Sequence, residues 1–235
     1  RLSIKSYGAK GNGVDDDSEH INKALTNIYT VTSATETGEF REIFFPAGVY
    51  ILDADSIYLP PNCTIRGEGK ERTILRMTNG SLPFVVGTMD SQAQKGLQIG
   101  NMSAEFPNNI KVENLSIKHD NDKDVLNLQR ASDVIFRDVK LSGNWSSGTS
   151  NSRAVVFDPL GSLYEHKNIS FVSCSFNNTG FVSNLNPESS ELKNIHFNSC
   201  DFSNHYRGIE INSSATSVLV NDSVFEEIEE TAILG

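Results

Sequence analysis

Three carboxylates in this sequence could carry out acid–base chemistry. Asp158 ends the run AVVFD, Glu210 lies in GIEI, and Asp201 lies in DFSN. If Asp158 and Glu210 lie on one parallel sheet two strands apart, the strand spacing of about 4.8 Å separates them by about 10 Å. That is near the upper end of the range of about 6.5 to 9.5 Å between the acid and the base of an inverting glycoside hydrolase. We therefore name Asp158 and Glu210 as catalytic candidates and Asp201 as the third, against the alternative that these acids only solvate a face.

A short turn before Glu210 brings together a cation and a phenol. The run SNHYRGIEI contains His205, Tyr206 and Arg207 just ahead of the carboxylate. Such a turn could bind acidic sugars, and in a lyase Arg207 could abstract a proton. We name all three as candidate substrate-binding residues, against the alternative that the turn is an ordinary one.

A longer loop contains the single tryptophan of the chain. Residues 142–153 read SGNWSSGTSNSR and include Trp145. An aromatic ring in such a loop can wall a saccharide groove by stacking on the apolar side of a sugar. The alternative is that Trp145 folds back onto its own segment. Asn184, at an outward position of GFVSNL, is a further candidate for substrate binding.

Five segments of the chain repeat one pattern of polar, apolar and turn-forming residues. Their starts are separated by 24, 35, 26 and 23 residues, and a period of this size predicts stacked coils. Within each segment the alternation of apolar residues indicates strands with one buried face, bent in the middle by Asn, Asp or Ser. The segments are NIKVENLSI from Asn109, DVIFRDVKL from Asp133, NISFVSCSF from Asn168, NIHFNSCDF from Asn194 and SVLVNDSVF from Ser217.

Cysteines and phenylalanines recur at equal places in these coils. Cys174 and Cys200 occupy the same place in FVSCSF and FNSCDF. Free cysteine is among the most buried residue types, so we expect both to be reduced, buried and stacked. Aromatic residues at matching places predict parallel stacks in the same core, namely Phe171, Phe176, Phe197 and Phe202.

The opening stretch YGAKGNGVDDDSEHINKAL predicts a turn followed by a helix. Its glycines have neither the P-loop nor the dinucleotide spacing, and its aspartates lack the alternating spacing of an EF-hand loop. Apolar residues at positions i, i+3, i+4 and i+7 instead predict an amphipathic helix over residues 16–29. Asp16, three residues before Glu19, predicts a start similar to a capping box.

Together these motifs resemble the pectate-lyase superfamily of right-handed parallel β-helices. The resemblance rests on the opening stretch, on IFFPAGVYIL with its turn of Pro46, Gly48 and Tyr50, on LPPNCTIRGEGKERTIL and on the repeated coils. It implies an all-β fold in which residues 1–40 form an N-terminal strand and a capping α-helix and residues 41–235 form the coils. The final run TAILG is similar to the first strand of another coil, so we expect the natural chain to continue.

The composition argues against several kinds of partner. A formal net charge of −10 disfavours binding to a nucleic-acid backbone or an anionic membrane surface. The chain has no apolar run long enough for a membrane span of about 20 residues, and its start lacks the pattern of a signal peptide. We expect no cofactor and no metal, because the three cysteines are too scattered for a zinc site. The acidic run KHDNDKDV is more typical of a solvated turn than of a calcium site.

Three functions remain open, because the family includes pectate lyases, polygalacturonases, rhamnogalacturonan-cleaving enzymes and bacteriophage tailspikes. We favour a phage tailspike or tail-fibre β-helix, on a virion or otherwise extracellular, that binds and cleaves a bacterial surface polysaccharide. The second is a secreted pectinase-like lyase or hydrolase, and the third is a non-catalytic structural or adhesive solenoid. Apolar outward residues such as Val156 and Phe181 predict a homotrimer in which the copies bury them.

Overall fold

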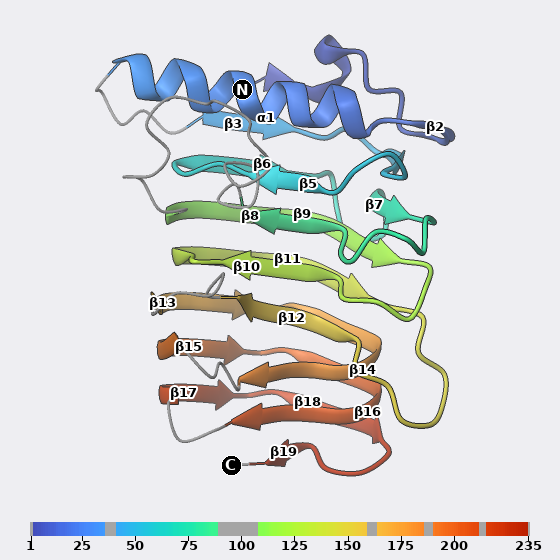
Figure 1. Ribbon diagram of the computed structural model, residues 1–235, viewed down its shortest axis with the longest axis vertical. Coiled ribbons are helices and arrows are strands. Elements are labelled where there is room, and N and C mark those ends of the chain that lie inside the picture. The colour runs from blue at the N-terminus through green and yellow to red at the C-terminus, as the bar shows by residue number, and fades with distance from the viewer. Residues whose placement is uncertain are drawn as a thin grey trace.

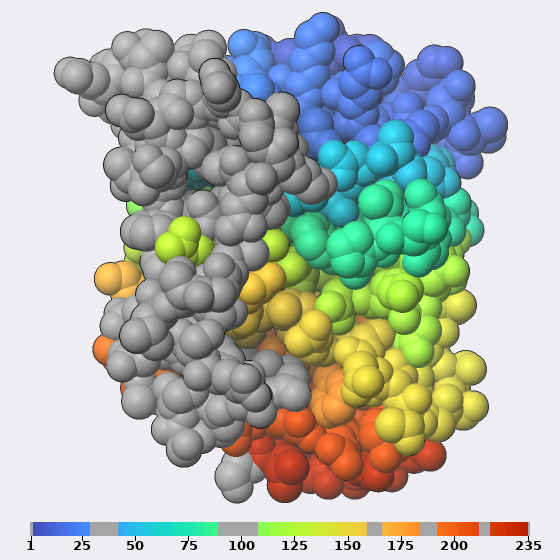
Figure 2. Space-filling view, viewed as in Figure 1, coloured from blue at the N-terminus to red at the C-terminus, as the bar shows by residue number. Residues whose placement is uncertain are grey.

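The computed structural model describes residues 2–35, 41–88, 108–158, 164–185, 190–211 and 215–234. At a few of these positions, Asn184 among them, only the backbone is described. The strands pair in parallel and stack into a solenoid, with α1 (Ser18–Thr35) lying across the N-terminal end (Figure 1). On the surface, residues close in sequence form successive layers from one end to the other (Figure 2). The predicted all-β, right-handed parallel β-helix with an N-terminal capping helix is confirmed.

Each coil contributes strands to three faces of the solenoid. The first face contains β1 (Leu2–Ser3), β3 (Arg41–Phe44), β6 (Cys63–Arg66), β13 (Tyr164–Val172), β15 (Ser190–Asn198) and β17 (Ala215–Asn221). The second contains β2 (Asn12–Asp16), β4 (Gly48–Ile51), β7 (Thr73–Met77) and β18 (Val224–Ile228). The third contains β5 (Ile57–Leu59), β8 (Val86–Thr88), β10 (Leu126–Gln129), β12 (Arg153–Asp158) and β19 (Ile233–Leu234). Long strands bend from the first face to the second, β9 (Asn108–His119) and β11 (Ser132–Ser142), or from the second to the third, β14 (Ser175–Leu185) and β16 (Asp201–Ile211).

The register between coils follows the repeats that the sequence predicts. Val134 pairs with Ile110 and Ile169, and Ile195 pairs with Ile169 and Val218. The residue before each of these starts its segment and bends the chain, and all five such residues have a left-handed backbone with φ between 54° and 58°. The bends predicted in the middle of the segments are also present, with φ between 46° and 57° at Asn114, Asp138, Ser173, Ser199 and Asp222. Asn and Asp tolerate this conformation better than other residues with a side chain, which explains their recurrence there.

Side chains at the bends also hydrogen-bond from coil to coil. Asn168 Nδ2 donates to Asp133 Oδ1 at 2.8 Å, and Asn194 Nδ2 donates to Asn168 Oδ1 at 3.1 Å. Asn109 Nδ2 donates to Asn62 Oδ1 at 2.9 Å. Asn62 shares the left-handed conformation, with φ of 56°, so it marks an earlier coil that the alignment of five segments missed. The bends therefore form a polar ladder along one edge of the solenoid.

The helix α1 starts at the aspartates, as predicted, and runs past the predicted end at residue 29. Asp16 Oδ1 accepts a hydrogen bond from the Ser18 amide at 2.8 Å, two residues on rather than at Glu19. The buried Asp17 carboxylate instead accepts from the amides of Lys10 and Gly11 at 2.6 and 2.9 Å. It thereby ties the glycine turn, which follows the short helix η1 (Ile4–Tyr7), to the start of α1. In the described ranges no helix combines the length and apolarity needed to cross a membrane.

Two aromatic stacks fill the core, as the sequence predicts. The rings of Phe136, Phe171 and Phe197 stack with centroids 4.9 and 5.0 Å apart. A second stack runs beside the first, with Phe176 and Phe202 separated by 4.9 Å. Each such ring is fully or almost fully buried. The coils are therefore held together by direct contact between equal side chains of adjacent coils.

Cys174 and Cys200 are free, fully buried thiols in adjacent coils, as predicted. The neighbouring Cys200 thiol and burial raise the pKa of Cys174, and burial raises the pKa of Cys63. All three thiols are fully buried, so we expect none of them to react with a disulfide reagent in the native protein. The check is the rate of thiol release in buffer against the rate in urea. Rapid labelling of Cys174 and Cys200 before unfolding would contradict this.

Candidate functional site

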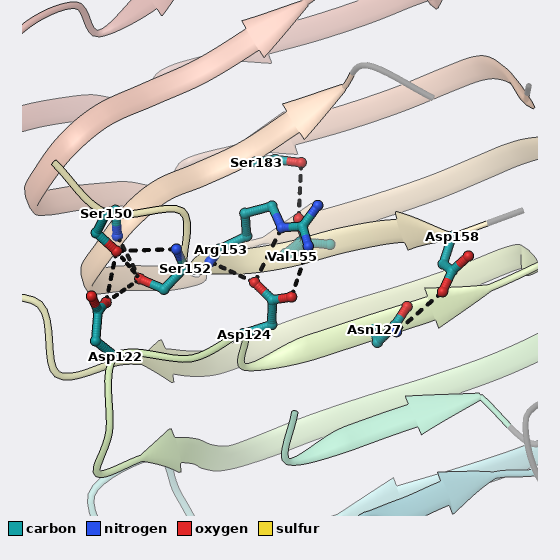
Figure 3. Close-up of polar contacts among 10 residues, drawn as sticks. Asp122, Asp124, Asn127, Ser150, Ser152, Arg153, Val155, Asp158 and Ser183 are labelled. Atoms are coloured by element: carbon teal, nitrogen blue, oxygen red, sulfur yellow. Dashed lines mark hydrogen bonds and ion pairs between the residues drawn. The ribbon is translucent and has the colours of Figure 1, made fainter. Parts of the chain in front are cut away.

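The third face carries polar side chains on its outer side. Along β10, Leu126 and Leu128 lie fully buried in the core, so the alternating residues Asn127 and Gln129 face outward. The pairing of β10 with β12 sets Gln129 level with Asp158. Figure 3 shows this region, where strands of successive coils carry polar side chains in neighbouring rows.

Asn127, Gln129 and Asp158 form the first polar group on this face, here called the acceptor cluster. Asn127 Nδ2 donates to Asp158 Oδ2 across 3.4 Å (Figure 3). The exposed fractions of Asn127 and Gln129 are 8% and 5%, whereas Asp158 is half-buried. Asn127 Oδ1 and Gln129 Oε1 accept no hydrogen bond within the part of the chain that the structure describes. The cluster therefore contains two buried acceptor oxygens beside a half-buried carboxylate.

Two aspartates of the run KHDNDKDV hold the edge of this face in place (Figure 3). Asp124 accepts from Arg153 Nη2 at 2.8 Å and from Arg153 Nε at 3.1 Å. Asp122 Oδ1 accepts from the hydroxyls of Ser150, at 2.8 Å, and of Ser152. The two carboxylates bind different partners, so side-chain hydrogen bonds hold this turn in place in addition to its solvation. Among the described residues no group of His, Cys, Asp and Glu could hold a metal ion.

A second polar group surrounds Arg207 and is here called the arginine cluster. Arg207 Nη1 donates to Glu210 Oε1 at 2.7 Å, and Arg207 Nε donates to Glu230 Oε2 at 2.5 Å. The Tyr206 hydroxyl donates to Glu230, and the guanidinium lies 5.3 Å from the Tyr206 ring centroid and 5.9 Å from that of Phe181. Hydrogen bonds from Tyr206 and Arg207 lower the pKa of Glu230. The bonds to Glu230 and Glu210 raise the pKa of Arg207, so the guanidinium stays charged.

The two main catalytic candidates share this face but are not level with each other. Asn184 pairs with Glu210, and the register of β12 with β14 sets Val156 level with both. Asp158 lies two residues further along its strand. Two strand spacings of about 4.8 Å and two residues of about 3.3 Å separate Asp158 from Glu210 by about 12 Å. This separation exceeds the range of about 6.5 to 9.5 Å for an inverting pair.

Asp201 lies on another face of the solenoid. The strand β16 bends at Asn204, where φ is 58°. The exposed Asp201 precedes this bend and pairs with Ser175 on the second face, whereas Glu210 follows it on the third. The structure therefore does not bring Asp201 to the other two carboxylates. The side chain of Asn184 lies outside what the structure describes.

Two predicted substrate-binding side chains pack inward. His205 is fully buried, with Nε2 3.0 Å from the carbonyl oxygen of Phe176 and Nδ1 3.1 Å from that of Thr179. The prediction for His205 is therefore wrong, because a ring enclosed by the core cannot reach a ligand. Trp145 is 6% exposed, and its Nε1 donates to the Gly148 carbonyl at 2.7 Å. Its ring folds back onto its own coil, so Trp145 does not wall a groove.

The apolar residues that predicted a homotrimer are also buried. The exposed fractions of Val156 and Phe181 are 7% and 8%, so they offer little surface to another copy. The homotrimer stays a prediction without that support. Large exposed apolar side chains of the described residues lie at the two ends of the solenoid, Leu2 and Val14 at one and Leu219, Val224, Ile233 and Leu234 at the other.

A family comparison agrees with the coils and their register. The profile described as rhamnogalacturonase A/epimerase, pectate lyase-like, matches residues 2–233. The chain belongs to this family. The match covers both the capping helix and the coils, so this pectate lyase-like chain follows the family along nearly its whole length.

Sequence relatives of the pectate lyase-like chain match only in part. It is 34% identical over 67 residues to the non-secreted LysM effector LysM19 of Penicillium expansum, covering 28% of the chain and 5% of that protein. It is 31% identical over 75 residues to the preneck appendage protein of Bacillus phage PZA, covering 32% of the chain and 7% of that protein. The alignments thus take in a small fraction of either relative's length.

Solved structures with the same fold include proteins of two viruses. The N-terminal fragment of gene product 12 of bacteriophage phi29 has a TM-score of 0.58 and 18% identity, over 98% of this chain and 42% of that chain. ORF18 of Geobacillus virus E2 has a TM-score of 0.52 and 14% identity, over 99% of this chain and 59% of that chain. At these identities the likeness shows the fold alone.

Sequence reasoning missed Glu230 as a member of the site. Glu230 follows Arg207 by 23 residues, which is also the interval between the last two repeats (217 − 194). A residue one repeat interval after Arg207 lies beside it on the next coil. The interval could therefore have identified Glu230 from the pectate lyase-like repeats alone.

Proposed function

We propose that the chain is the polysaccharide-binding β-helix of a virion appendage and that it cleaves the polysaccharide by hydrolysis. The observation that carries the proposal is the run of polar side chains on successive coils of the third face, from the acceptor cluster to the arginine cluster. An extended polymer lying along the solenoid axis would meet acceptors first and a cation later. The partial identity to a phage preneck appendage protein supports the placement on a virion.

The ion pairs of Arg207 favour hydrolysis over an elimination that uses this residue as the base. Arg207 is bound to both Glu210 and Glu230, and these bonds raise its pKa. A base must lose its proton near the working pH, so a guanidinium held in this way is a poor one. Arg207 and Tyr206 instead hold Glu230 in place, and Arg207 also holds Glu210, so they position the carboxylates that a sugar would meet.

The proposed acid and base are Asp158 and Glu210, with Asp201 and Glu230 as the next candidates. In an inverting hydrolysis one carboxyl protonates the leaving oxygen and the other activates a water molecule. The separation of about 12 Å from strand spacing makes Glu230, bridged to Glu210 by one guanidinium, a strong competitor of Asp158.

The test compares amide variants on bacterial surface and pectic polysaccharides. Asp158→Asn and Glu210→Gln preserve shape and remove the proton chemistry, so each should lower the rate of reducing-end release by about 10² or more with binding unchanged. The matched control is Glu226→Gln. Glu226 is an exposed carboxylate of β18 on the second face of the solenoid, so this variant should keep full activity.

Three other results of this experiment would support different conclusions. Full activity in both amide variants removes the pair and leaves Asp201 and Glu230. Binding without any cleavage by the unaltered protein favours the adhesive solenoid. If the unaltered protein neither binds nor cleaves any of the polysaccharides, the proposed function as a whole is refuted.

A further inference from the structure

The acceptor cluster contains two amide oxygens that nothing in the described structure satisfies. Asn127 Oδ1 and Gln129 Oε1 are both buried and both without a hydrogen-bond partner among the described residues. The orientation of the Asn127 amide is fixed, because its Nδ2 faces the Asp158 carboxylate. Buried polar groups are nearly always hydrogen-bonded, so two unmet acceptors on one face call for an explanation.

The backbone holds these side chains in place. The Thr88 hydroxyl donates to the backbone carbonyl of Gln129 at 2.7 Å and accepts from the backbone amide of Gln129 at 2.9 Å. Leu126 and Leu128, on the inward side of the same strand, are fully buried. The amide side chains therefore cannot turn inward, and their oxygens stay on the outer side of β10.

Apolar walls border the cluster along the axis. Asn127 is level with Gly87 on one side and with Val156 on the other. A Cβ added at Gly87 would lie 2.7 Å from the Phe84 ring, so this ring covers the glycine beside Asn127. Phe84 in turn packs edge-on against Tyr58, with ring centroids 6.0 Å apart. Apolar walls with a few fixed polar groups are typical of small-molecule sites.

The chemistry of the cluster selects the ligand. Two amide oxygens and one carboxylate are acceptors, so a ligand must present donors to them. An anionic sugar would meet the Asp158 carboxylate, whereas a neutral sugar offers hydroxyl donors and apolar C–H groups for the walls. We propose that Asn127, Gln129 and Asp158 form a subsite for one neutral sugar residue, bound through its hydroxyl groups. The proposal rests on the proposed polysaccharide function and specifies the kind of sugar accepted at this position.

The experiment measures binding and stability together. The probes are glucose, galactose and N-acetylglucosamine, with glucuronate and galacturonate as anionic counterparts, titrated by calorimetry into the unaltered protein and into Asn127→Leu and Gln129→Met. Each variant should weaken binding of a neutral probe at least tenfold, since one hydrogen bond is lost. Gln129→Met should also unfold at an equal or higher urea concentration, because it removes an unpaired buried acceptor. Stability is compared in this variant, since Asn127→Leu also removes the hydrogen bond to Asp158.

Loss of binding without loss of stability separates a binding role from a structural one. Asn198→Leu is the matched control, since Asn198 Oδ1 on the first face already accepts from Asn221. This variant should leave binding of the probes unchanged. Deoxy analogues of the bound sugar give a test that needs no variant, because removing a donor hydroxyl should weaken binding to the unaltered protein at least tenfold.

Several results would overturn the subsite. The first is that no neutral probe binds, and the second is that the uronates bind as tightly as the neutral probes or more tightly. The third is that the affinity is unchanged in both Asn127→Leu and Gln129→Met. If the polysaccharide still binds and is cleaved in those cases, the subsite is wrong and the proposed function stands. If a neutral probe binds as predicted but no polysaccharide does, the subsite stands and the proposed function is wrong.

Discussion

Lowering the pH from 7 to about 5 should destabilise this protein by about 2 kcal/mol for each of the buried histidines His166 and His205. Burial, the largest cause, lowers the pKa of His166 and of His205 to about 4. In the unfolded chain a histidine has a pKa of about 6.5. Between these values the unfolded state binds more protons than the native state, so the free energy of unfolding falls as the pH falls. The loss begins near the unfolded pKa and is complete below the folded one.

Urea unfolding at several pH values between 7 and 5 measures this slope. His205→Gln should flatten it in part, since burial lowers the pKa of three described histidines, His119, His166 and His205, and one of them is removed. The half-buried His196, on the outer side of the first face, provides the control. His196→Gln should leave the slope unchanged. An unaltered protein with the same unfolding midpoint at both ends of this pH range would contradict the prediction.

Truncating a fully buried ring that contacts both aromatic stacks should cost more than any other single change considered. Phe197 is fully buried, stacks on Phe171 at 5.0 Å and meets Phe176 and Phe202 edge-on at 5.8 Å. We expect Phe197→Ala to lower the free energy of unfolding by about 3 to 5 kcal/mol, because the neighbouring coils are too rigid to close the cavity.

The matched control is Phe225, which ends the second stack. Phe225 is half-buried and stacks on Phe202 at 4.5 Å. Phe225→Ala should cost clearly less than Phe197→Ala in the same urea titration, because it removes contacts on one side only. Equal losses, or a loss below about 1 kcal/mol for Phe197→Ala, would show that the stack does not hold the coils together.

The fold could be predicted from the sequence because every coil repeats the same physical requirement. An apolar residue such as Ile169 or Ile195 must face the core, and the residue before it must adopt the left-handed bend. Asn and Asp fill that role at low cost, so their recurrence was visible in the sequence. The bends were predicted only in the middle of each segment, and the left-handed residues at the segment starts were not predicted. Asn62 belongs to the same ladder. It was missed because Asn62 and Asn109 are 47 residues apart, whereas the starts of the five segments are separated by 23 to 35 residues.

The candidate site was harder to predict because small shifts decide where a side chain points. The left-handed bend at Asn204 interrupts the alternation of β16, and His205, directly after it, lies in the core, whereas Arg207 is half-buried. Asp158 and Glu210 were placed on the correct face, but their offset of two residues depends on the register between β12 and β14. The intervals between the repeats vary from 23 to 35 residues, so the repeat alone did not fix the register between these strands to the residue.

Because the bend ladder repeats once per coil, variants of this molecule with more or fewer coils would differ in axial length by whole coils. Each coil adds one strand spacing of about 4.8 Å to the axis, and the bends from Asn62 to Ser217 repeat the same conformation. Duplicating or deleting one coil would therefore leave both neighbouring coils with a matching surface. Lineages could lengthen or shorten such a rod by whole coils, and could vary the loops between the bends, without redesigning the parts that hold it together.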